Sequence, residues 1–208
     1  MLKRGLYAKC KIIECYPDLT IFTVKAFGQI MSAYDIHKYS PLQYAVFQSS
    51  ITQIGYMPSE AMFYSGMRVG DIIRTSASLH KKDCSAQAKE LCERLQLDVK
   101  KRVDELSLGN RKKVSIVCAL QHSPRLYILD EPTSGLDPLM QKEFFTLLKE
   151  RHKDGATIFL SSHVLSEIAR YCSRAAIIRE GKLIAQDTME ALSSRTKGSY
   201  CSQSWADI

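Results

Sequence analysis

The sequence predicts an α/β protein with a parallel sheet, and three observations carry this prediction. Apolar strand-like runs alternate with helical segments from residue 84 onward. The chain has 208 residues, of which 45% are hydrophobic and 25% charged, as in one ordinary globular domain. The longest apolar runs are far shorter than the roughly 20 residues that a membrane-spanning helix needs. We therefore expect one α/β domain, or one domain with a subdomain.

The first predicted helix begins at Asp83 or Ser85, because both residue types cap helices. Its apolar positions recur at helical spacing: Ala88, Leu91, Cys92 and Leu95. A second helix begins near Ser107. Its expected buried positions are Val114, Val117, Cys118 and Gln121. Pro124 then separates this helix from an apolar strand at 126–129.

The third helix has the clearest boundaries. Asp137 is a good N-cap, Pro138 suits the first turn, and Gly155 supplies a left-handed stop before a strand at 156–160. Its apolar positions are Phe144, Phe145, Leu147 and Leu148. The sequence thus predicts a strand, helix, strand order over 126–160.

The two ends of the chain give weaker signals. A helix around 164–172 precedes two short runs, 175–178 and 182–185, which flank a Glu-Gly turn and predict a hairpin. The polar tail, 196–208, carries no element signal. Residues 1–50 contain short strand-like runs at 11–15 and 19–24, and this region stays unassigned.

The charge and the cysteine content limit which cellular compartments and which partners are compatible with the sequence. The seven cysteines are odd in number and form no C-x-x-C pair, which indicates neither a disulfide framework nor a zinc site. No leader pattern opens the sequence, so we expect a cytoplasmic protein with reduced thiols. The net charge of +7 suits nucleic acid, an anionic membrane face or an anionic ligand such as ATP, and does not choose among them.

The stretch 126–137 carries the chemistry. Its buried strand delivers Asp130 at the carboxyl end, where ligands of open α/β sheets bind, so this carboxylate can hold a magnesium ion. Glu131 follows at once and is expected on the other side of the strand end. There it could accept a proton from a water that attacks a γ-phosphate. A strand ending in a solvated Asp-Glu loop is the alternative for the short pattern alone.

The string LDEPTSGLD at 129–137 resembles the Walker B and D-loop string of the ABC ATPase family. The resemblance implies an ABC ATPase domain at 51–195, with a P-loop NTPase-like parallel sheet and a helical signature subdomain. The N-terminal part of this fold is incomplete or altered. The resemblance also implies ATP and Mg²⁺ as cofactors, Glu131 as a catalytic residue and Asp130 as the metal ligand. Asp137, the last residue of the string, is implied to bind the nucleotide.

Upstream, the segment LSLGN at 106–110 resembles the signature of the same family, whose usual form ends in Gly-Gly-Gln. Leu108 and Asn110 depart from that form, whereas Ser107 and Gly109 keep it. A serine and backbone amides at a helix start form an anion site, and the following Lys112 and Lys113 are expected to add positive charge nearby. By resemblance, Ser107, Gly109 and Asn110 bind nucleotide. By itself, Ser107 could be an N-cap only.

Two further segments match the family. IGYMPSE at 54–60 resembles the approach to its Q-loop, with Ser59 where glutamine is usual and Glu60 as a possible substitute. Ser59 is shorter, but it can still reach a metal-bound water. His163 follows a predicted strand, as the switch histidine of the family does, and is implied to contact the γ-phosphate. A lone histidine in such a place is otherwise a cap or surface residue.

The phosphate-gripping motif G-x-x-x-x-G-K-[ST] is not recognisable, since Gly5 and Gly28 are the only glycines before Gly55. The chain is therefore either a truncated or frame-altered product, or a partner that contributes its signature half. The resemblance implies an ATPase subunit of a transporter, working with a polytopic membrane permease and a second ATPase subunit at the inner face of the cell membrane. A transporter subunit is not expected to have a nucleic acid partner. The alternatives are a non-catalytic pseudo-ATPase and a nucleic-acid- or ribosome-associated protein.

Overall fold

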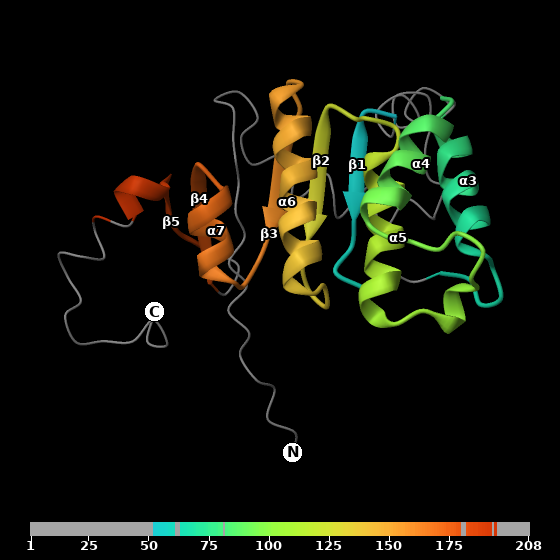
Figure 1. Ribbon diagram of the computed structural model, residues 1–208. Helices are drawn as coiled ribbons and strands as arrows, with labels where there is room; N and C mark the ends of the chain where they lie inside the picture. The colour runs from blue at the N-terminus through green and yellow to red at the C-terminus, as the bar shows by residue number, and fades with distance from the viewer. Residues whose placement is uncertain (1–51, 61–62, 81, 180–181, 193, 195–208) are drawn as a thin grey trace, which may run out of the picture. The chain divides into compact units, whose positions relative to one another are not determined.

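The computed structural model describes residues 52–60, 63–80, 82–179, 182–192 and 194. Within them the chain forms two compact units, one ending at residue 160 and one beginning at residue 161. The first contains β1 (Ile54–Met57), α3 (Val69–Leu79), α4 (Ser85–Arg94), the 3-10 helix η2 (Val103–Glu105), α5 (Leu108–Leu120), β2 (Leu126–Asp130), α6 (Pro138–Lys153) and β3 (Thr157–Ser161), whose last residue is at the boundary (Figure 1). The unassigned region 1–50, with its strand-like runs, and the tail 196–208 lie outside the described residues.

The strands of the first unit form a sheet in the order β1, β2, β3. Strands β1 and β2 run parallel, and Met57 lies opposite Leu129 in their register. Tyr127 and Leu129, on one face of β2, are almost completely buried. The predicted α/β class with parallel strands is confirmed, and the register brings the carboxyl ends of β1 and β2 to the same edge.

Helix α5 packs directly against β1. A methyl group added at Gly55 would lie 2.4 Å from the carbonyl oxygen of Ala119 and 2.9 Å from a ring carbon of Pro124. Only glycine allows this close approach between helix and strand. The contact brings the C-terminal end of α5 to the start of β1.

Burial of α5 extends further than the sequence predicted. Val114, Val117 and Gln121 are buried as expected, whereas Cys118 is only half-buried. The helix also buries Lys112, Lys113, Ser115, Ile116, Ala119 and Leu120. The expectation of one buried side was therefore wrong, because β1, α3 and α4 all contact this helix.

The predicted ends of α6 are confirmed. Asp137 is the N-cap, and its Oδ1 accepts a hydrogen bond from the Met140 amide at 3.0 Å. Gly155 adopts φ +90° after the helix, and the amide of Ala156 donates to the Arg151 carbonyl at 3.0 Å. This bond belongs to the helix end, so β3 begins one residue later than predicted.

The helical segment before α5 was only partly predicted. Helix α4 begins at Ser85, but its N-cap is Cys84 without a side-chain cap bond, so the prediction of Asp83 or Ser85 as the cap was wrong. Asp83 Oδ1 accepts instead from the amide of Ser85, the first helical residue, at 2.9 Å. Helix α3 was not predicted. It follows Arg68, whose side chain makes no cap bond, so the sequence contained no start signal for it.

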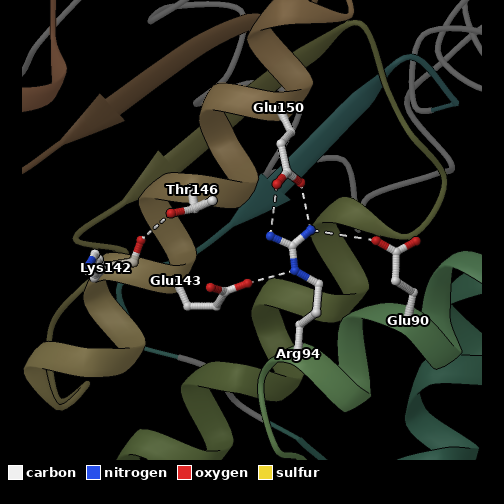
Figure 2. Close-up of polar contacts among 6 residues, drawn as sticks. All are labelled: Glu90, Arg94, Lys142, Glu143, Thr146 and Glu150. Carbon is white, nitrogen blue, oxygen red and sulfur yellow. Dashed lines mark hydrogen bonds and ion pairs between the residues drawn. The ribbon is translucent and has the colours of Figure 1, made fainter.

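Arg94 joins α4 to α6 (Figure 2). Its Nε lies 2.6 Å from Glu143 Oε1, and its Nη1 lies 2.6 Å from Glu150 Oε2, both on α6. Glu90, one turn earlier on α4, lies 3.5 Å away. Hydrogen bonds to Glu150 and Glu143 raise the pKa of Arg94, and the bond to Arg94 lowers the pKa of Glu150. These ion pairs thus connect two helices that are far apart in the sequence.

The second unit contains α7 (Leu165–Tyr171), β4 (Arg174–Arg179) and β5 (Lys182–Thr188). Strands β4 and β5 pair antiparallel, which confirms the predicted hairpin. Helix α7 is one residue shorter at each end than the predicted segment 164–172. Across the part of the chain that the structure describes, no helix is both long enough and apolar enough to cross a bilayer.

Candidate functional site

The carboxyl end of β2 delivers the two predicted carboxylates. Strand β2 ends at Asp130, which is half-buried, and Glu131 follows with φ +47°. A non-glycine residue in the left-handed region is uncommon and occurs often at functional sites. We expected Glu131 to point to the opposite side from Asp130 because side chains alternate along a strand. That reason does not apply, because the chain leaves the extended conformation at Glu131.

The segment after β1 lies beside this strand end. Since Met57 pairs with Leu129, Ser59 and Glu131 each follow two residues beyond a register pair at the same edge. Burial raises the pKa of Tyr56, and the negative charge of Asp130 raises it further. Sequence reasoning missed Tyr56 as a neighbour of Asp130, although the register of two parallel strands would have indicated it.

Lys112 lies in a different place from the one expected. Its side chain is buried, and its Nζ donates to the carbonyl oxygen of Ser59 at 2.7 Å. Lys113 is buried as well. The expectation that both lysines add charge at the start of α5 is therefore wrong for Lys112, whose ammonium lies at the sheet edge.

The signature-like segment forms the start of α5. Ser107 is the exposed N-cap, and its Oγ accepts from the Asn110 amide at 3.4 Å. Ser107 therefore caps α5, and its binding of nucleotide stays a prediction. Leu108 is 68% exposed, while Gly109 and Asn110 are half-buried. The first amides of a helix have no partner within it, so this end can accept an anion.

The signature-like segment and the D-loop-like turn contact each other within the chain. A Cβ added at Gly109 would lie 2.5 Å from the Gly135 carbonyl oxygen, so a side chain at Gly109 would force the start of α5 away from the turn that contains Gly135. Gly135 itself adopts φ +79°, and Leu108 lies against it. Sequence reasoning did not identify Gly135, although a glycine between two motif residues was the available signal.

Asp137 and His163 belong to different units of the chain. The carboxylate of Asp137 caps α6, and the residue is exposed at the end of the D-loop-like turn. His163 is exposed between β3 and α7, in the second unit. Next to it, Ser162 Oγ accepts from the Val164 amide at 3.0 Å and donates to Glu167 at 3.2 Å. A contribution of His163 to the Asp130 site stays a prediction.

The residues at the sheet edge fit magnesium by their donor chemistry. Asp130, Glu131, Glu60 and Ser59 supply oxygen atoms only, which hard divalent cations prefer. Among the residues that the structure describes, no group of three or more His, Cys, Asp or Glu side chains could enclose a metal. Proteins usually hold Mg²⁺ with one or two carboxylates, several waters and substrate phosphates, and Asp130 and Glu131 offer two carboxylates.

Comparison with known proteins finds sequence relatives over most of the chain. The family model described as ABC transporter matches residues 23–134. The bacitracin transport ATP-binding protein BcrA of Bacillus licheniformis is 36% identical over 151 residues, which are 71% of this chain and 49% of that protein. The probable multidrug ABC transporter ATP-binding protein YbhF of Escherichia coli is 30% identical over 69% of this chain and 25% of its own length. The chain thus spans about half the length, or less, of these relatives.

Solved structures give the same fold. An ATP-binding subunit of an ABC transporter superposes with a TM-score of 0.66 at 28% identity, covering 75% of this chain and 67% of that one. The dimeric ATP-binding cassette MJ0796 with ADP and Pi has a TM-score of 0.62 at 18% identity, covering 73% of this chain and 68% of that one. The second likeness concerns the fold alone.

Proposed function

The chain belongs to the ABC transporter family, and from that premise we propose that it is an ATP-binding and ATP-hydrolysing subunit that powers transport through a separate membrane permease. The observation that carries the proposal is the Asp130–Glu131 pair at the carboxyl end of β2, beside the segment that follows β1. Carboxylates at that edge suit a magnesium-dependent nucleotide site. The relatives named for bacitracin transport and multidrug transport support a role in transport.

Each residue at the sheet edge has a distinct role in the proposed reaction. Bound Mg²⁺ would neutralise charge on the β- and γ-phosphate oxygens. Asp130 would hold that ion through water, and the Ser59 hydroxyl would assist through a water bound to the ion. Glu131 accepts a proton from the water that attacks the γ-phosphate. His163, which belongs to the second unit and not to the sheet edge, takes the switch role toward the γ-phosphate that the family resemblance implies.

The start of α5 serves a second nucleotide. Ser107, the amide of Gly109, Asn110 and Asp137 bind the ATP that a second subunit holds. The exposed position of Ser107 supports this role, because a partner can reach it. Two ATPase subunits, alike or different, would therefore form the working unit, and the permease would hold them at the inner face of the membrane. A partner with an intact phosphate loop supplies the motif that is not recognisable here.

The test of the proposed function is Glu131→Gln in vesicles that contain the permease, this chain and a second ATPase subunit. We expect ATP turnover to fall about a hundredfold or more, because the general base is lost, with ATP retained in the assembly. Phosphate release and nucleotide retention are measured on the same samples. Glu93→Gln, an exposed change on α4, serves as the matched control.

Ser107→Arg tests the second half-site in the same assembly. We expect this chain and its partner together to hydrolyse ATP faster than the sum of the two separate proteins. The arginine fills the phosphate position at the helix start, so this stimulation should disappear while the circular dichroism spectrum stays unchanged. Unchanged turnover with Glu131→Gln would refute the general-base role. Full stimulation with Ser107→Arg would refute the role of α5 on a second nucleotide.

A further inference from the structure

The buried lysine of α5 has a role that the motif residues do not explain. Lys112 is 3% exposed, and charged side chains are almost never buried to that degree unless they are paired. Its Nζ donates to the Ser59 carbonyl oxygen at 2.7 Å. A carbonyl is a neutral acceptor, so this bond satisfies a donor of the ammonium without balancing its charge.

The packing of α5 shows where the ammonium lies. The helix contacts β1 at Gly55 through Ala119, and Lys112 reaches Ser59 two turns nearer its N-terminus. Helix and strand therefore run in opposite directions, and Lys112 is at the carboxyl edge of the sheet. By the register of β1 and β2, this is the edge where Asp130 ends its strand.

Three carboxylates act electrostatically on the Lys112 ammonium. Burial lowers the pKa of Lys112, and the negative charges of Asp130, Glu131 and Glu60 oppose that change. These carboxylates come from two strand ends, since Glu60 follows β1, Asp130 ends β2 and Glu131 follows it. Among the described residues, the ammonium of Lys112 is thus one positive charge that the protein places near these carboxylates.

We propose that Lys112 is a built-in counter-cation of the metal-binding edge, which holds the Ser59 segment in place and offsets the charge of Asp130 and Glu131. This inference rests on the proposed function, because it takes Asp130 as the metal ligand. Lys112 is a positioning residue, since it acts on the carboxylates and not on the nucleotide. Its charge repels a divalent cation that arrives alone, so the edge favours a cation that arrives with the phosphates of a nucleotide.

The experiment measures Mn²⁺ binding to the full chain without nucleotide, from the electron paramagnetic resonance signal of free Mn²⁺. Lys112→Gln removes the charge but keeps a donor for the Ser59 carbonyl, and it should tighten Mn²⁺ binding about tenfold, as expected for loss of a nearby like charge. Lys112→Arg keeps the charge and should stay within about twofold of the unchanged protein. Lys113→Gln, at the neighbouring buried lysine, should also stay within about twofold.

The sign of the effect separates this role from a merely structural one, because a loosened edge would bind Mn²⁺ more weakly. Adding Asp130→Asn to Lys112→Gln should remove the gain. If Lys112→Gln does not fold by circular dichroism, Lys112→Met takes its place with the same expectation. Equal or weaker binding by the neutral variant, or no binding by any variant in the millimolar range, overturns the proposal. A gain in Mn²⁺ affinity together with unchanged turnover in Glu131→Gln would refute the proposed catalytic role alone.

Discussion

A stacked pair of histidines predicts how the stability of this chain depends on pH. His122, between α5 and β2, is 2% exposed, and its ring lies parallel to that of His80 with 3.5 Å between centroids. Its Nε2 lies 3.1 Å from the Ile54 carbonyl oxygen. The pKa of His122 is lowered to about 4, first by burial and then by the charges of His80 and Lys82, against the opposing effect of the Ile54 carbonyl. A proton on His122 is therefore unfavourable in the folded chain.

The sign and the magnitude follow from the two pKa values. The ordinary value is 6.5, so between pH 6.5 and about 4 the unfolded chain binds a proton at His122 that the folded chain does not. Stability from this group is present above pH 6.5 and is lost as the pH falls through that window. Lowering the pH from 7 to 5 should cost about 2 kcal/mol of the free energy of unfolding through His122.

The assay is urea unfolding of the full chain at pH 7 and pH 5, followed by circular dichroism. His122→Gln keeps a donor for the Ile54 carbonyl and should reduce the loss between the two pH values by about 2 kcal/mol. Ser123→Asn, a neutral change at the exposed neighbour, should leave the loss unchanged. If His122→Gln shows the same loss as the unchanged protein, burial of a neutral imidazole is not the cause of the pH dependence.

Two further substitutions test contacts that the structure reports. Gly109→Ala should destabilise the chain by about 1–3 kcal/mol in urea unfolding, because its Cβ would lie 2.5 Å from the Gly135 carbonyl oxygen. No change would mean that the start of α5 and the turn at Gly135 separate without cost. Arg94→Met should cost about 1–2 kcal/mol, less at high salt, since its side chain and its partners on α6 are partly exposed. Glu90→Gln removes only the outermost pair and should cost about 0.5 kcal/mol or less, so an equal loss in both variants would contradict the proposed link between α4 and α6.

Local signals predicted the elements whose ends depend on neighbouring residues. Asp137 and Gly155 gave the two ends of α6, because capping and left-handed turns involve residues a few positions apart. Helix α3 lacked such a signal and was missed. Family membership could be predicted because motif residues such as Asp130 and Glu131 are consecutive and their order is visible in the sequence.

The sequence by itself determined the fold class, the Asp-Glu pair at a strand end and the capped start of α5, since each depends on short-range patterns. Only the tertiary structure decided the contact of Gly109 with Gly135 and the position of the Lys112 ammonium at the sheet edge. The residues of each pair are 26 and 53 positions apart in the chain (109 to 135, and 59 to 112). No local pattern encodes such distances, because they depend on how closely α5 packs against β1, which Gly55 permits.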